Sequence, residues 1–271
     1  MPDPLPPDVA EAMRRLGDRR GSLGEPLYYF HETGSTNDVA AGYAEHGAGQ
    51  GTTVVAAAQT SGRGRLGRSW YSPAGAGLYV SIVIRSAAAT PYLTLAGGVA
   101  VAEGIRTATG LPLEIKWPND VVTPGSSGPA RRRKIAGILA EASSLAEGVQ
   151  YVILGIGINI SPAACPPELA DRASSIESEL GRAVEPAVVL TEVVAALSSE
   201  LDALERGDPS GLLKRWRRLA PSAVGTTVEC DTPLGRVTGI AAGIADDGAL
   251  LVRVGNQVER VIAGEVLWKQ G

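Results

Sequence analysis

The chain has 271 residues, of which 44% are hydrophobic and 20% charged, and a formal net charge of −4 at neutral pH. These values are typical of a soluble globular chain with one large domain, or one domain and a small module. No run of 18 or more apolar residues occurs, and the proline-rich, acidic start is no signal peptide, which excludes a membrane-spanning helix and secretion. We therefore expect a cytoplasmic protein with no membrane partner.

Cysteine and histidine are too sparse for a metal centre. Cys165 and Cys230 are far apart and fit no metal-ligand spacing, so free thiols are favoured over a disulfide. His31 and His46 are too few and too separated for a metal cage or a catalytic triad. The metal ligands, if any, are left unassigned.

The chain begins with an extension that covers residues 1–26. It contains one short amphipathic helix, which Asp8 is expected to cap and which ends at Arg15. A loop follows, and residues 27–30 then form the first expected strand. The main domain is therefore predicted to begin at residue 27.

A capping motif follows this strand. Ser35 and Asp38 stand at the N-cap and N3 positions of a capping box, which predicts a helix that ends near Gly47. The free N–H groups at its start are available to a polar ligand. From the residues alone, capping is the better-supported role for Ser35 and Thr36, and ligand binding is the alternative.

An arginine- and glycine-rich loop, residues 62–70, follows a strand expected at residues 53–58. Its three glycines allow close approach of the backbone to a ligand, and its three arginines offer planar donor forks to carboxylate or phosphate oxygens. No Asp or Glu lies between Glu45 and Glu103, whereas Arg85 adds a further cation. This local positive charge predicts an anion site.

The sequence of this loop allows three other interpretations. Gly62, Gly64 and Gly67 match a dinucleotide-binding fingerprint, but no helix or acidic residue follows as that motif requires. Disordered RNA-binding segments rich in Arg and Gly are repetitive, whereas this loop is short and flanked by strands. A solvated surface loop is the third option, and the alternation of Gly and Arg beside Trp70 argues against it.

The middle of the chain alternates strands, a helix and turns. The pattern predicts strands at 78–84, 134–141 and 151–160, two strand-like halves within 113–122, and a helix at 92–109. Lys116 ends one strand before the turn Trp117-Pro118-Asn119-Asp120. Residues 123–133 are expected to form a flexible loop.

Gly155 and Gly157 lie two residues apart in the last of these strands. Side chains of a strand alternate between its faces, so both glycines leave the same face bare. We expect that face to be able to receive a flat ring.

The last third changes from helices to short strands. Apolar spacing predicts one helix across 190–204, and Asp208-Pro209 starts another that ends near Leu219. Short strands separated by turns follow at 226–230, 235–242, 249–254 and 257–262. The chain is therefore divided into a catalytic domain, 27–221, and a small β-barrel module, 222–271.

The motifs together resemble the bacterial biotin protein ligases, also called biotin–[acetyl-CoA-carboxylase] ligases. The match runs in order from about Tyr28 to the C-terminus. The segments that carry it are Ser35-Thr36-Asn37, Gln59, Gly62-Arg63-Gly64-Arg65-Leu66-Gly67-Arg68, Lys116-Trp117-Pro118-Asn119-Asp120, Lys134 to Glu141, and Gly155-Ile156-Gly157-Ile158-Asn159. Two departures are Leu66, where many relatives have a basic or polar residue, and the long 123–133 insertion.

The resemblance implies an α+β fold: a mixed β-sheet with flanking helices, related to class II tRNA synthetases, and a C-terminal SH3-like barrel. It also implies a catalytic role for Lys116 and Arg63. The biotin-binding residues it implies are Ser35, Thr36, Asn37, Gln59, Arg63, Gly64, Arg65 and Lys116. The nucleotide-binding residues it implies are Arg65, Arg68, Trp70, Lys134 and Asn159.

The activity implied is activation of biotin with ATP and Mg²⁺ as biotinyl-5′-AMP, then transfer to a lysine of a biotin carboxyl carrier protein. A lipoate or octanoate ligase of the same fold and a non-catalytic biotin- or nucleotide-sensing regulator are the alternatives. Only about 26 residues precede the main domain, too few for a winged helix, so no nucleic-acid partner is expected. A homodimer is one option for the oligomeric state.

Overall fold

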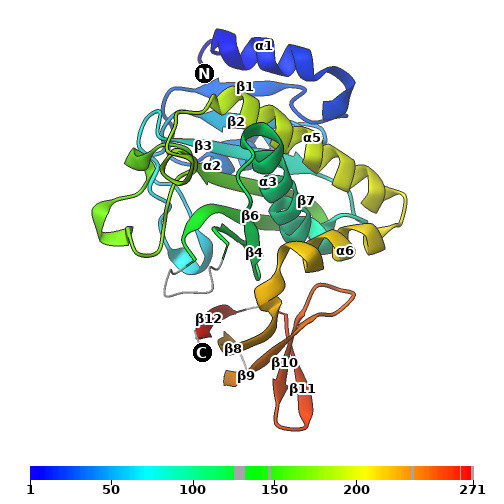
Figure 1. Ribbon diagram of the computed structural model, residues 1–271. Helices are drawn as coiled ribbons and strands as arrows, with labels where there is room; N and C mark the ends of the chain where they lie inside the picture. The colour runs from blue at the N-terminus through cyan, green and yellow to red at the C-terminus, as the bar shows by residue number, and fades with distance from the viewer. Residues whose placement is uncertain (125–131, 146–147, 233–234, 263, 270–271) are drawn as a thin grey trace.

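A seven-stranded mixed sheet forms the centre of the larger domain in the computed structural model, which describes residues 1–124, 132–145, 148–232, 235–262 and 264–269 (Figure 1). The strand order is β1-β2-β3-β7-β6-β5-β4. β1 pairs with β2 in parallel, and the other neighbours are antiparallel. The strands are β1 (Leu27–Phe30), β2 (Thr53–Ala56), β3 (Gly77–Ile84), β4 (Glu114–Lys116), β5 (Asp120–Val122), β6 (Lys134–Leu145) and β7 (Gly148–Asn159).

Helices cover the two faces of this sheet unequally. One face packs against the long helices, which form the main hydrophobic core, whereas α2 alone packs on the other. The helices are α1 (Pro7–Leu16), α2 (Thr36–Glu45), α3 (Leu93–Thr109), α4 (Ile176–Leu180), α5 (Pro186–Glu205) and α6 (Pro209–Leu219). The predicted α+β class and mixed sheet are confirmed.

Strand alternation explains how the sheet serves both a core and a site. On β3, Val80 and Ile82 point into the main core, whereas Val83 packs under α2. On β7, Leu154 and Ile156 join the main core in the same way. The α2 side of β7 carries Tyr151 and Ile153 and then only glycine and asparagine, so α2 covers part of that face and leaves the rest open for a site.

The extension before residue 27 packs onto the main core. Val9, Met13 and Leu16 of α1 and Leu23 after it are buried in the same cluster as the long helices. The domain boundaries at residues 27 and 222 stay predictions.

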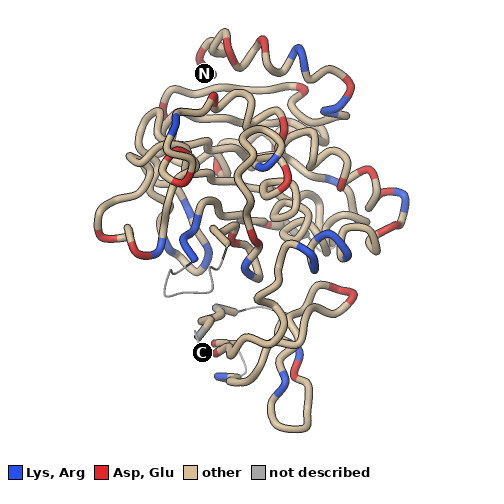
Figure 2. The backbone as a smooth tube through the Cα atoms, in the orientation of Figure 1, with Lys and Arg blue, Asp and Glu red and all other residues tan. Residues whose placement is uncertain are grey.

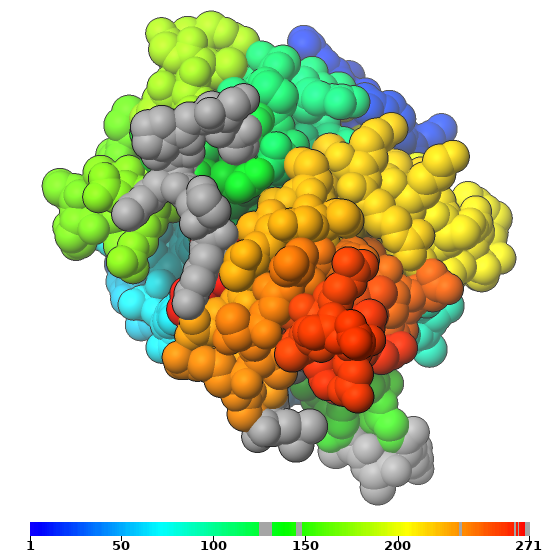
Figure 3. All heavy atoms as spheres, turned by 60° about the horizontal axis from the view of Figure 1, so that its bottom comes forward, coloured from blue at the N-terminus to red at the C-terminus, as the bar shows by residue number. Residues whose placement is uncertain are grey.

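The C-terminal module is one antiparallel sheet, with strand order β11-β10-β9-β8-β12. Its strands are β8 (Val224–Thr232), β9 (Gly235–Ile244), β10 (Leu250–Val254), β11 (Gln257–Val261) and β12 (Glu265–Lys269). β12 was not expected from the sequence. The small β module is confirmed, and closure into a barrel stays a prediction. Figure 3 shows this module, orange to red, against the gold end of α6.

The predicted starts of α2 and α6 are right, whereas the cap predicted for α1 is wrong. Asp8 lies inside α1, whose N-cap residue is Pro6, and the side chain of Ser35 makes no capping hydrogen bond although Ser35 is the N-cap residue of α2. Asp208, by contrast, caps α6 by accepting a hydrogen bond from the Ser210 backbone N–H at 3.2 Å. Proline at N1 serves α1, because it needs no acceptor for an N–H. Ser35 is thereby left available for another role.

Most of the 123–133 loop, residues 125–131, lies outside the described part of the chain. None of the described helices combines the length and the apolar composition that a bilayer-spanning segment needs.

Candidate active site

The open part of the α2 face has a floor made of glycine. Gly137 on β6 and Gly157 on β7 are cross-strand partners, and Gly155 pairs with Ser81 on β3. The absence of side chains lets other groups come close to the sheet. A Cβ at Gly155 would lie 2.3 Å from Oδ1 of Asn37, and one at Gly157 would lie 2.6 Å from the Trp70 indole.

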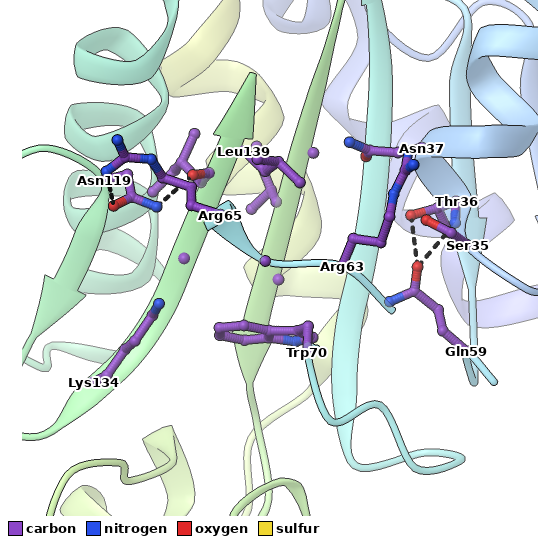
Figure 4. Close-up of a pocket in the computed structure, with 16 residues that line it drawn as sticks. Ser35, Thr36, Asn37, Gln59, Arg63, Arg65, Trp70, Asn119, Lys134 and Leu139 are labelled. Carbon is purple, nitrogen blue, oxygen red and sulfur yellow. Dashed lines mark hydrogen bonds between the residues drawn. The ribbon is translucent and has the colours of Figure 1, made fainter. Parts of the chain in front are cut away.

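Trp70 supplies a flat ring over one of the two glycines of β7, Gly157, whereas Asn37 lies over Gly155. Its indole lies on the floor, where a Cβ at Gly137 would be 3.0 Å from the ring (Figure 4). The Lys134 ammonium lies 4.9 Å from the ring centroid, a cation–π distance. The indole N–H is buried and has no acceptor among the described residues. The ring therefore rests on the floor through contact and charge.

The start of α2 forms one polar wall. Gln59, just after β2, accepts hydrogen bonds through Oε1 from the Thr36 backbone N–H at 2.8 Å and from the Thr36 hydroxyl at 3.1 Å. Gln59 Nε2 in turn donates to the Ser72 hydroxyl at 2.9 Å. Ser35 is buried in this wall and lines the cavity (Figure 4). The side chain of Gln59, rather than that of Ser35, thus satisfies the first turn of the helix.

A buried network connects this wall to Arg63. The Ser81 hydroxyl lies 2.8 Å from the Thr36 hydroxyl and also within hydrogen-bond distance of Oδ1 of Asn37. Asn37 donates through Nδ2 to Glu141. Glu141 also accepts from Arg63 at 2.9 Å, and Asp38 pairs with the same guanidinium at 2.8 Å. Asp38 thus holds Arg63, and Arg63 holds the loop against α2 and β6.

Two adjoining cavities occupy this region. Seven of the eight residues predicted to bind biotin line the first cavity: Ser35, Thr36, Asn37, Gln59, Arg63, Gly64 and Arg65. All five residues predicted to bind the nucleotide line the second: Arg65, Arg68, Trp70, Lys134 and Asn159. Gly64, Arg65, Trp70, Asn119 and Lys134 line both.

Lys116, assigned to both the catalytic and the biotin sets, lines the second cavity and not the first. It ends β4, opposite Asp120 on β5. Lys116 therefore lies on the second-cavity side of the junction.

The junction of the cavities is held by Arg65 and Asn119. Arg65 donates to Oδ1 of Asn119 and to the backbone carbonyl of Gly264 in the C-terminal module, both at 3.3 Å. Asn119 also donates to the Ile138 carbonyl at 2.8 Å, which fixes the β4–β5 turn to β6. Three segments far apart in the sequence therefore meet at one guanidinium.

Lys134 and Asn159, which also line the second cavity, already make contacts with other residues. Lys134 pairs with Asp120 at 2.6 Å in addition to its contact with Trp70. Asn159 is buried and donates to the backbone carbonyl of Ser174 at 3.0 Å, so its amide fixes the wall of the second cavity. Burial raises the pKa of the neighbouring Cys165 thiol, which therefore stays protonated at neutral pH.

Figure 2 shows several Lys and Arg positions along the part of the larger domain's backbone nearest the C-terminal module. Arg85, counted in the positive region from the sequence, lies elsewhere. It donates to the carbonyls of Ala44 and Ala48 at the end of α2 and lines neither cavity. The anion site therefore uses the loop arginines and the lysines, and Arg85 serves the fold.

Ser81, Glu141 and Asn119 were missed as site residues. Ser81 has a recognisable signal, because it is the one polar residue within the apolar run Leu78 to Ile84 of β3. Among the described residues, no group of three or more His, Cys, Asp or Glu side chains is placed to hold a metal ion.

The arrangement suits a ligand with a polar head, an apolar body and an anionic end. The first cavity offers hydroxyls and amides at α2 and an apolar side chain, Leu139. Of the cationic residues, Arg63 lines the first cavity alone, Arg65 and Lys134 line both cavities, and Arg68 and Lys116 line the second. Such a site can bring a carboxylate against a phosphate.

Comparison with known proteins agrees with this geometry. Residues 29–159 match the biotin/lipoate A/B protein ligase family, and residues 228–267 match the biotin protein ligase C-terminal domain. The biotin–[acetyl-CoA-carboxylase] ligase of Mycobacterium tuberculosis is 33% identical over 98% of this chain and 97% of its own. The chain belongs to the biotin protein ligase family.

A second relative and a solved structure are also similar to this ligase. The bifunctional ligase/repressor BirA of Bacillus subtilis is 34% identical over 96% of this chain and 79% of its own. The biotin protein ligase from Aquifex aeolicus, solved in complex with biotin and ATP, superposes with a TM-score of 0.76. That superposition covers 90% of the present ligase and 99% of the Aquifex chain, at 28% identity.

Proposed function

We propose that this ligase joins biotin to a lysine of a carboxyl carrier protein in two steps, and that the two adjoining cavities divide the work. Biotin lies in the first cavity, with its ring system at the hydroxyls and amides of α2. Its carboxylate then points to the junction at Arg65, Trp70 and Lys134. The observation that carries the proposal is this junction, because it is where the cationic residues of both cavities meet.

In the first step a biotin carboxylate oxygen forms a bond to the α-phosphorus of ATP, and the bond to the bridging oxygen breaks. Pyrophosphate leaves with the electron pair, and biotinyl-5′-AMP remains. Negative charge develops on the phosphate oxygens, which Lys116, Lys134 and Arg65 are placed to stabilise from the second cavity. Mg²⁺ enters with ATP, bound by the phosphates, and no protein nucleophile is needed.

In the second step the amine nitrogen of the carrier lysine attacks the carbonyl carbon of the mixed anhydride. AMP leaves, and the nitrogen loses a proton to solvent. Before the amine arrives, the anhydride must be kept from water, and the loop with Trp70 supports that function because it covers the glycine floor. We place the reaction in the cytoplasm, where ATP and carboxylase subunits are available.

Pyrophosphate exchange into ATP tests the first step directly. We expect exchange that depends on biotin and is absent with lipoate or with amino acids. Replacing Lys116 by Ala should lower the exchange rate by roughly 10²–10³, the usual loss when one charge-stabilising donor is removed. If lipoate supports exchange, lipoate rather than biotin is the substrate. If no acid supports exchange, a non-catalytic sensor is favoured.

A further inference from the structure

The C-terminal module holds the catalytic domain through the turn between β9 and β10. The Trp117 indole N–H donates to the Gly248 carbonyl at 3.0 Å, and the Tyr92 hydroxyl donates to the Asp246 carbonyl at 3.2 Å. Arg217 adds hydrogen bonds to the Ile244 carbonyl and the Asp246 carboxylate, both at 3.2 Å. Three side chains of the larger domain thus fix one turn of the smaller module.

Trp117 connects that turn to the chemistry. It is buried, at 4% exposure, and directly follows Lys116 at the end of β4. On its other side, Asn119 fixes the same β4–β5 turn to β6. The β4–β5 turn that directly follows Lys116 is therefore fixed on one side by the large sheet and on the other by a backbone carbonyl of the C-terminal module.

We propose that Trp117 is a positioning residue, through which Gly248 of the C-terminal module holds Lys116 at the nucleotide side of the junction. This inference rests on the catalytic role proposed for Lys116. Its consequence is that the C-terminal module takes part in adenylate formation without lining the first cavity. The module's second contact with the site, from the Gly264 carbonyl to Arg65, supports the same assignment.

The test is Trp117→Phe, which keeps an aromatic ring and removes the N–H donor. A small misplacement of a catalytic group costs up to about 10² in rate, so we expect kcat for pyrophosphate exchange to fall roughly tenfold. KM for biotin should stay unchanged, since neither Trp117 nor Lys116 lines the biotin cavity. Gly248→Ala should give the same pattern, because a new Cβ would lie 2.8 Å from Leu95 and displace the turn.

Trp216→Phe is the matched control. Trp216 is also fully buried, but its indole N–H has no acceptor among the described residues, and it lies in α6 away from both cavities. Its replacement removes the same atoms without touching the β4–β5 turn. We expect exchange within about twofold of the wild-type rate, the scatter of independent sites.

The decisive measurement repeats Trp117→Phe in a Lys116→Ala background. If Trp117 acts through Lys116, it has no further effect there, because the group it positions is gone. An equal fall in both backgrounds, or no fall in the wild type, overturns the inference and leaves the role of Lys116 intact. If Lys116→Ala alone leaves exchange unchanged, the proposed role of Lys116 fails first, and the inference falls with it.

Discussion

Gly157→Ala tests whether the Trp70 indole rests on the glycine floor. The added Cβ would lie 2.6 Å from Cε2 and Nε1 of the indole. Ordinary carbon contacts are about 3.5–4.0 Å, so the ring must retreat by roughly 1 Å. The ring is attached to a loop, whereas Gly157 lies in the middle of a paired sheet. We therefore expect the loop to move and the sheet to stay.

The magnitude follows from the cost of inserting one methyl group into a packed site, about 1–3 kcal/mol. A difference of 1.4 kcal/mol is tenfold, so adenylate formation should fall by roughly 5- to 150-fold. If the strain stayed in the folded protein, Tm would drop by several degrees, since about 1 kcal/mol corresponds to roughly 2–4 °C at this size. Because the loop absorbs it, Tm should change by less than about 2 °C.

Pyrophosphate exchange and thermal unfolding on the same preparation separate these outcomes. Gly42→Ala is the control, because it lies in α2 with no atom within 4 Å of the new Cβ. It should keep wild-type exchange and gain about 0.5–1 kcal/mol in the free energy of unfolding. Wild-type exchange in Gly157→Ala would show that the indole does not occupy the floor during turnover, and the account of the loop would be wrong.

Three further predictions concern the junction, the buried network and the C-terminal module. Arg65→Ala removes the hydrogen bonds to Asn119 and Gly264. It should raise the amount of AMP released per biotinylated carrier roughly tenfold, with AMP release measured in the presence and absence of the carrier. An unchanged ratio of AMP to biotinylated carrier would exclude a shielding role for Arg65. Ser81→Ala removes the hydroxyl that lies beside Thr36 and Asn37. Because an unpaired buried polar group costs about 1–3 kcal/mol, KM for biotin should rise about tenfold with little change in kcat. Unchanged steady-state kinetics would show that Ser81 does not contribute to biotin binding. Burial raises the pKa of the Cys230 thiol to about 11, so this thiol ionises in the unfolded chain before it ionises in the folded protein. The free energy of unfolding should therefore fall as pH rises from about 9 to about 11, and Cys230→Ala should make that fall less steep. An identical slope in the variant would assign the pH dependence to other groups.

Local patterns predicted the limits of some helices and strands well. The limits of β1 and α6 agree with the sequence expectation, because a turn signal or a proline marks each end. β12 was missed, since residues 265–269 follow no clear turn motif and pair only with β8, about 35 residues earlier. Pairing between distant segments is what a single sequence shows least.

The sequence predicted the site as a list of residues and said little of its geometry. The glycine floor was expected to receive a flat ring, but nothing local indicated that the ring would be the chain's own Trp70, more than 80 residues away. Ser35 has the sequence position of a capping residue, yet Gln59 satisfies the helix start instead. Tertiary contacts replaced the local hydrogen bond, and a single-sequence pattern cannot show such a substitution.

Lys116 shows the same limit. The motif placed it at a strand end, and the family resemblance assigned it to biotin binding, which stays a prediction, whereas the fold places it in the lining of the second cavity and not of the first. The difference arises because β4 is the edge strand farthest from α2 in the sheet order. Strand order is a global property and was not available from the spacing of the motif.

A crystal structure of this ligase with a non-hydrolysable analogue of biotinyl-5′-AMP tests the central claim most directly. The account predicts the biotin ring beside Ser35 and Thr36, the adenosine in the second cavity, and the acyl phosphate link at Arg65, Trp70 and Lys134 under the loop. An adenosine bound outside the second cavity, with residues 62–70 extended into solvent, would contradict it.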